Sequence, residues 1–187
     1  MREQLLETGL DTLHRQGFNG TSVQDITEAA GVPKGSFYNH FESKEALGVA
    51  VVRRYVQDRS RHMTILADHE VPPLKRVRRY FAAMAQQAAD TGDIRGCLIG
   101  NFATELSGQS PVIRQELTHA LQGWTDALVP VLVEAQQAQH LSADVSAQEL
   151  AHLLIDSWEG AVLRCKVEQS GRPLERFLTH TLKRLLV

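Results

Sequence analysis

Hydrophobic residues recur every three to four positions along most of the chain, and no segment shows the two-residue alternation of a β-strand. This pattern predicts an all-α protein of about nine helices. The longer predicted helices cover residues 1–16, 44–68, 74–89, 97–106, 111–139, 146–169 and 174–186, and two shorter ones lie within 21–47. Pro130 predicts a kink in its helix. Asp144 or Ser146 is expected to cap the next helix, and turns are expected at 91–93 and 170–173.

Residues 21–47 have the pattern of two short helices joined by a tight turn, with a third helix beginning directly afterwards. Ser22 is a suitable N-cap, and Asp25 places a carboxylate where the helix dipole favours it. Gly31 provides the left-handed residue that ends the first helix, and Pro33 suits the start of the second. Phe37 and Phe41 are expected to face inward. The pattern therefore predicts a helix-turn-helix, whose second helix enters the major groove of DNA.

Three runs in this stretch, G-F-N-G-T-S-V-Q-D-I, A-G-V-P-K-G-S-F-Y-N-H-F and S-K-E-A-L, carry a family resemblance. Together they resemble the DNA-binding domain of the TetR family of transcriptional repressors. The resemblance implies a three-helix DNA-binding domain at 1–47 and a ligand-sensing and dimerisation domain at 48–187. It also implies phosphate contacts from Thr21, Ser22, Tyr38 and Lys44.

Base contacts are expected from the side chains that the second short helix turns outward. Lys34 and Ser36 are the first candidates, Asn39 and His40 the next, and Gly35 would allow close approach to a groove edge. The alternative is that Ser22 only caps a helix and Tyr38 only fills the core.

The charge of the chain argues against indiscriminate binding to nucleic acid. The formal net charge is −2, and the first 44 residues hold four basic against six acidic side chains. Specific binding, which can rest on a few well-placed donors, remains compatible with this charge. Four arginines follow in residues 53–61, and we interpret them as a solvated charged face in preference to a second nucleic-acid surface.

Composition places the chain among globular proteins of a reducing compartment, and we expect a cytoplasmic location. We find no apolar run of membrane-spanning length and no signal peptide. The two cysteines lack metal-ligand spacing, so we expect no metal site, and no cofactor motif is present. The expected partners are double-stranded operator DNA, a small-molecule inducer and a second copy of the chain. The two last predicted helices carry wide apolar stripes that would pair in a two-fold four-helix bundle, and the family resemblance implies the same homodimer.

Cys97 lies in the run R-G-C-L-I-G-N at the start of a predicted helix, where N–H groups and the helix dipole favour a thiolate. This region is similar to the NemR-type subgroup of the family, which responds to electrophiles and oxidants. In that subgroup a cysteine in a G-C-L motif acts with a lysine of the penultimate helix, and the matching residues here are Cys97 and Lys166. The alternative is that Cys97 is a small buried hydrophobic residue. Cys165 is interpreted as core, with a disulfide to Cys97 as the lesser option.

Five aromatic residues could line a ligand pocket in the C-terminal domain, although aromatic residues at helical spacing are more often plain core: Tyr80, Phe81, Phe102, Trp124 and Trp158. Two further hypotheses stay open. One keeps the repressor and makes induction purely non-covalent. The other is a helical enzyme or ligand carrier, against which the chain shows no nucleophile–base set, phosphate-binding glycine loop or metal pair.

Overall fold

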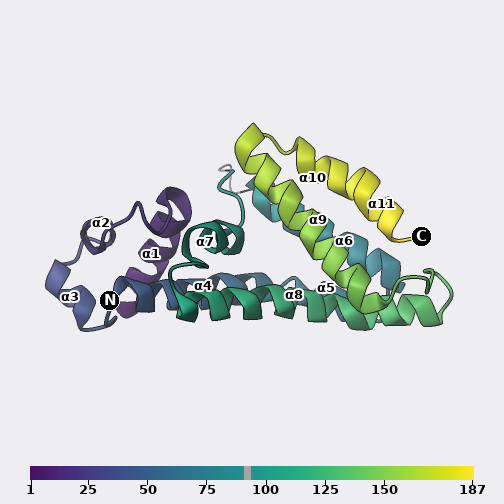
Figure 1. Cartoon of the computed structure of the whole chain (residues 1–187), viewed down its shortest axis with the longest axis horizontal. Helices are drawn as coiled ribbons and strands as arrows, with labels where there is room; N and C mark the ends of the chain where they lie inside the picture. Colours follow the sequence, from purple (N-terminus) through teal and green to yellow (C-terminus); the bar gives the residue numbers. More distant parts are fainter. Residues whose placement is uncertain (91–93) are drawn as a thin grey trace. The chain divides into compact units, whose positions relative to one another are not determined.

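The computed structural model describes residues 1–90 and 94–187, and every regular element among these residues is a helix (Figure 1). The expected turn at Thr91–Asp93 lies outside them. The packing divides the chain into two compact units, each built from two segments. The first unit comprises 1–58 and 98–120, and the second comprises 59–97 and 121–187. The all-α prediction is confirmed.

The first unit holds the helix-turn-helix, formed by α2 (Val23–Ala29) and α3 (Lys34–Tyr38), and all or part of four further helices. These are α1 (Arg2–Gln16), nearly all of α4 (Lys44–Ser60), α7 (Leu98–Leu106) and the start of α8 (Pro111–Gln137). Its core includes the fully buried apolar side chains of Leu5, Leu13, Ile26, Phe37, Leu47 and Phe102. The predicted boundary at 47/48 therefore does not coincide with the division that the packing makes.

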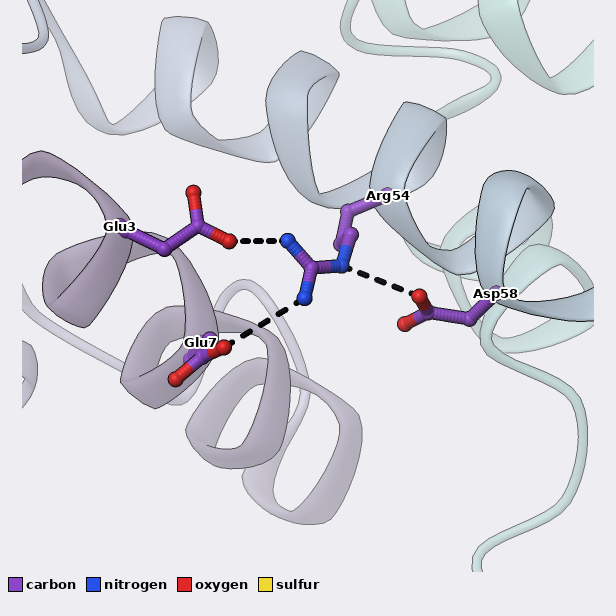
Figure 2. Close-up of polar contacts among 4 residues, drawn as sticks. All are labelled: Glu3, Glu7, Arg54 and Asp58. Atoms are coloured by element: carbon purple, nitrogen blue, oxygen red, sulfur yellow. Dashed lines mark hydrogen bonds and ion pairs between the residues drawn. The ribbon is translucent and has the colours of Figure 1, made fainter.

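An arginine of α4 holds α1 against α4 through carboxylates (Figure 2). The Arg54 guanidinium bonds Glu3 and lies 3.4 Å from a Glu7 oxygen, and its Nε donates to Asp58 at 3.1 Å. Arg53 pairs with Glu116 of α8, with Nε to carboxylate oxygen at 3.0 Å. Acidic side chains thus engage these two arginines of the basic run.

The second unit packs the remaining helices around an aromatic core. They are α5 (Met63–Leu66), α6 (Pro73–Asp90), the rest of α8, α9 (Ala147–Glu168), α10 (Arg172–Arg176), the π-helical segment η1 (Phe177–Thr181) and α11 (Leu182–Leu185). Phe81 lies 5.3 Å from Trp158 and 5.0 Å from Phe177 between ring centroids. The run from α10 to α11 packs along α9 (Figure 1).

Two predicted helices differ from the observed ones. The helix expected at 44–68 ends at Ser60, and α5 follows as a separate turn, which brings the total among the described residues to ten when α10, η1 and α11 count as one. At the break the Thr64 hydroxyl donates to the Arg61 carbonyl and competes with the helical bond. The last helix begins at Arg172 and contains a π segment, so Leu182 and Leu186 are buried while Leu185 is only half-buried.

Other boundaries follow the sequence closely. Ser146 is the cap of α9, where its hydroxyl oxygen accepts the Glu149 N–H at 3.2 Å, and Asp144 lies outside the helix. The helix α8 continues through Pro130 to Gln137. None of the helices in the described part of the chain is long and apolar enough to cross a lipid bilayer.

Candidate functional site

The helix-turn-helix forms as its local sequence dictates. The Ser22 hydroxyl oxygen accepts the Asp25 N–H at 3.1 Å, and the Asp25 carboxylate accepts the Ser22 N–H at 2.7 Å, which closes a capping box at the start of α2. These bonds lower the pKa of Asp25 below its usual value, because they favour the charged form. Gly31 has φ +66° and ends the helix in the left-handed region. Gln4 of α1 donates to the Ala30 carbonyl at 2.8 Å and holds α2 against α1.

The second short helix presents its polar residues outward as predicted. Phe37 is fully buried and Phe41 is 5% exposed, and their ring centroids lie 5.7 Å apart. Lys34, Gly35 and Asn39 are exposed, whereas Ser36 and His40 are half-buried. α3 ends at Tyr38, so Asn39 and His40 occupy the turn that follows it. These residues together form the reading surface, a name we use for Lys34–Ser36 and Tyr38–His40.

Tyr38 belongs to this surface and not to the core. Its side chain is 55% exposed, while its ring stands edge-on to Phe37 at 5.3 Å between centroids. The core interpretation of Tyr38 is therefore wrong, and its phenol is accessible to a phosphate group.

Thr21 and Lys44 have internal roles that the sequence did not reveal. Thr21 is 1% exposed, and its hydroxyl donates to the Gly17 carbonyl at 2.7 Å. The Lys44 ammonium donates to the carbonyls of Phe18 at 2.9 Å and Thr21 at 2.8 Å, above the Phe18 ring. Burial lowers the pKa of Lys44, and the charges of Glu105 and Asp25 oppose that shift. A buried hydroxyl that already donates is not available to phosphate, so the expected phosphate contact of the Thr21 side chain does not fit this structure.

Cys97 lies in the second unit, directly before α7, and is 8% exposed. Its thiol is hydrogen-bonded to the side chain of Glu159 of α9, seven residues before Lys166, and Lys166 itself is exposed. Burial raises the pKa of Glu159, while the Cys97 hydrogen bond and the Arg59 charge partly oppose the rise. One carboxylate oxygen of Glu159 is buried without a hydrogen-bond partner. Sequence reasoning missed Glu159, because nothing in its local pattern marks it.

The second cysteine and the aromatic residues are core. Cys165 is 3% exposed, its pKa is raised by burial, and no disulfide joins it to Cys97, both residues lying in the described part of the chain. Tyr80, Phe81, Trp124 and Trp158 are at most 3% exposed within the second unit, and burial raises the pKa of Tyr80 to about 12. Phe102 instead packs on Phe18 in the first unit, with ring centroids 5.7 Å apart, so it does not belong with the other four.

A surface hollow of about 490 Å³ lies in the second unit, lined by Arg61, His62, Ala83, Gln86, Gln87 and Asp90. His62 is hydrogen-bonded to Gln87 there at 2.8 Å. Among residues 1–90 and 94–187 no group of three metal-ligating side chains comes together.

Comparison with known proteins matches two family models to this chain. Residues 5–51 match the model described as bacterial regulatory proteins, tetR family, and residues 73–181 match the tetracyclin repressor-like C-terminal domain. The HTH-type transcriptional repressor DhaR of Mycobacterium sp. strain GP1 is 44% identical over all of this chain and 92% of its own length. The repressor NemR of Escherichia coli K12 is 32% identical over 96% of this chain and 90% of its own length.

Solved structures share the fold over nearly the whole chain. The reduced form of E. coli NemR has a TM-score of 0.88 at 32% identity, covering 100% of this chain and 96% of that one. A regulatory protein TetR from Rhodobacter sphaeroides has a TM-score of 0.90 at 34% identity, covering 99% of this chain and 98% of that one. Because similarity to DhaR exceeds similarity to NemR, the comparisons do not single out the NemR-type subgroup.

Proposed function

This chain belongs to the TetR family of transcriptional repressors, and from that premise we propose that it binds operator DNA as a homodimer and leaves it when a small electrophile or oxidant modifies Cys97. The family consists of transcription regulators, which excludes the enzyme hypothesis. We place the regulator in the cytoplasm, where its DNA is.

The observation that supports DNA reading by α3 is the division of its side chains. Phe37 anchors the helix in the core, and the reading surface is left to solvent on the other side. Lys34 and Ser36 are the proposed base-edge contacts, with Asn39 and His40 beside them. Ser22 and Tyr38 are the proposed phosphate contacts, because both are exposed hydroxyls close to helix ends. Lys44 keeps a third ammonium hydrogen beyond the two it gives to carbonyls, so a phosphate contact from it remains part of the proposal.

Dimerisation is proposed through the outer face of α9. Leu153, Gly160 and Val167 are spaced by seven residues and share one face with Leu163. Leu163 is 56% exposed and Val167 77% exposed, an unusual apolar surface for a single copy to leave in water. A two-fold pair would carry two reading helices, and half-sites about 34–36 Å apart are what such a pair recognises.

The proposed sensing thiol is Cys97, and its surroundings change the expected chemistry. The residue that faces the thiol is a carboxyl group, so the proposed partner Lys166 would have to act beside Glu159. An ionised Glu159 would repel a thiolate, whereas a neutral one would not, and Arg59 lies near enough to moderate that charge. Cys165 is the weaker candidate because burial raises the pKa of its thiol.

DNA binding is tested with the segment upstream of the chain's own gene in a gel-shift assay. We expect a salt-sensitive shift that an unrelated duplex of equal length does not compete away. Lys34→Ala should weaken the shift and narrow the difference in affinity between the upstream segment and the unrelated duplex, while Lys75→Ala of α6 should leave both unchanged. Equal binding to both duplexes would contradict operator recognition.

Thiol sensing is tested with N-ethylmaleimide on the same complex. Modified wild-type protein should release the DNA, Cys97→Ser should hold it, and Cys165→Ser should behave as wild type. If Cys97→Ser still releases, or if wild type does not, the inducer acts without this thiol. The non-covalent alternative would then stand, with the buried aromatic residues Tyr80, Phe81, Trp124 and Trp158 as its candidate pocket.

A further inference from the structure

The helix α7 belongs by sequence to the C-terminal family region, since it lies within residues 73–181, yet its contacts place it in the unit that contains the helix-turn-helix. Its first N–H, that of Leu98, donates to the Tyr55 hydroxyl of α4 at 3.1 Å. Phe102 packs edge-on against Phe18, which follows α1. α7 is therefore fixed at its start and its middle to elements of the DNA-binding unit.

The last turn of α7 makes the most specific of these contacts. The Glu105 carboxylate accepts the backbone N–H of Phe18 at 3.2 Å and of Asn19 at 2.8 Å, one oxygen for each. Gly17, with φ +83°, makes room for it, because a Cβ there would lie 2.8 Å from a Glu105 oxygen. Backbone N–H groups bonded to an ionised carboxylate are among the stronger hydrogen bonds in proteins.

The segment that Glu105 holds is the connection from α1 into the helix-turn-helix. Its N–H groups bond Glu105, and two of its carbonyls, those of Phe18 and Thr21, bond the Lys44 ammonium. The next residue, Ser22, is the cap that starts α2. The Glu105 carboxylate thus bonds N–H groups of this connection and the Lys44 ammonium bonds its carbonyls, and the two charges attract each other. We call Glu105, Lys44 and the connection 17–21 the clamp.

We propose that Glu105 is a positioning residue for operator binding, which acts from outside the DNA-binding domain by fixing the connection that sets where α2 and α3 begin. The inference rests on the DNA-binding function of the family. It gives a role in DNA affinity to α7, which lies outside residues 5–51. Without the carboxylate, the N–H groups of Phe18 and Asn19 lose their partner, while the capping box and the buried Phe37 keep the short helices intact.

The test is Glu105→Gln, with Glu116→Gln as its matched control. The amide keeps one acceptor oxygen but turns an NH₂ group toward the second N–H, so the clamp loses one bond and its charge. Glu116 is also a half-buried carboxylate of the first unit, and its partner is the Arg53 side chain instead of the α1–α2 connection. Affinity for the upstream DNA segment is measured by fluorescence anisotropy over a salt series, together with amide hydrogen exchange and thermal unfolding.

We expect Glu105→Gln to bind the DNA about tenfold more weakly, within the usual range of coupling between sites, with faster exchange at Phe18 and Asn19. Glu116→Gln should stay within twofold of wild type. Gly17→Ala, whose Cβ would displace the Glu105 carboxylate, should also weaken binding and serves if Glu105→Gln does not fold.

A Glu105 that only stabilises the fold would lower the unfolding temperature and leave the affinity and salt slope of the folded protein unchanged. That result, or equal weakening in Glu116→Gln, would overturn the inference. Failure of wild-type protein to bind the segment would instead contradict the proposed function itself, so the two failures are distinguishable.

Discussion

At the scale of single residues, a methyl group added at Gly35 is expected to have opposite effects on folding stability and on DNA affinity. Gly35 lies exposed inside α3, and a Cβ built there meets no atom within 4 Å. Alanine should therefore raise the free energy of unfolding by about 0.5–1 kcal/mol, since glycine is the poorer helix former. The same methyl group would stand between the helix and the groove edge, and operator affinity should fall.

Urea unfolding and anisotropy measured on Gly35→Ala check the two opposite effects. Gly123→Ala provides the control, because Gly123 lies in α8 with equally open space and lies outside the reading surface. It should gain similar stability without a change in affinity. If Gly35→Ala binds DNA as tightly as wild type, Gly35 does not lie against the bases.

Glu159 gives the stability of the protein a defined pH dependence. Burial raises its pKa in the folded state above the usual 4.5, so between these two values the folded chain holds more protons than the unfolded chain. Stability should consequently fall as pH rises through that window and stay reduced above it. Glu159→Gln should match wild type below pH 4.5 and exceed it at pH 8.

The difference is measured as unfolding temperature from pH 4 to pH 8. A gain of roughly 2–4 °C at pH 8 would correspond to about 1 kcal/mol for a chain of this size. Glu168→Gln, which removes a carboxylate from an exposed position of the same helix, should not reproduce the pH-dependent gain. A Glu159→Gln protein less stable than wild type at pH 8 would show that the ionised carboxylate is favourable where it lies.

Several residues had roles that the sequence could not disclose, because their partners are far away along the chain. Lys44 bonds carbonyls 23 and 26 residues before it, and Glu105 bonds N–H groups 86 and 87 residues before it. Gly9 of α1 lies so close to a distant residue that a Cβ there would be 3.0 Å from Leu47. Local patterns reveal which side chains face out, as on α3, and not what each one bonds.

At the scale of helices, ends were predictable where a cap or glycine marks them, as at Ser22, Gly31 and Ser146. The break after Ser60 was not, since no glycine or proline lies there; beside it the Thr64 hydroxyl bonds the Arg61 carbonyl and His62 bonds Gln87. The π segment at Phe177–Thr181, which packs against α6 and α9, was likewise not predicted. The hydrophobic period predicted the type of each element, whereas the continuity of a helix depends on its tertiary contacts.

The start of α7 depends on one buried phenol, which yields a prediction for the element as a whole. Tyr55 is 3% exposed and accepts the Leu98 N–H. Tyr55→Phe keeps the ring and removes the hydroxyl, so the buried Leu98 N–H loses its acceptor at a cost of about 1–3 kcal/mol. Urea unfolding should show this loss, whereas Tyr38→Phe, at an exposed ring, should change stability by less than about 0.5 kcal/mol. Equal stability of Tyr55→Phe and wild type would mean that another group takes over the bond.

At the scale of the whole molecule, the outer face of α9 decides whether one copy can act alone. Leu163 and Val112 offer a matched pair, since their side chains are 56% and 54% exposed, the first on α9 and the second at the start of α8. If α9 joins two copies, Leu163→Glu places two like-charged groups near a two-fold axis and leaves them desolvated. Val112→Glu adds the same charge to a surface outside the proposed interface.

Sedimentation equilibrium at micromolar concentration should therefore find Leu163→Glu mostly as a monomer and Val112→Glu as a dimer like wild type. Operator affinity should fall when the dimer dissociates. A single copy reads one half-site, whereas the second copy of a dimer also binds the half-site about one duplex turn away. Leu163→Glu should then weaken binding by at least a hundredfold, the lower end of what linking two binding modules gains. A Leu163→Glu protein that remains a dimer and binds normally would move the interface to another face of the second unit. If the wild-type protein is a dimer and both variants are monomers, the dimer interface includes the start of α8 as well as α9.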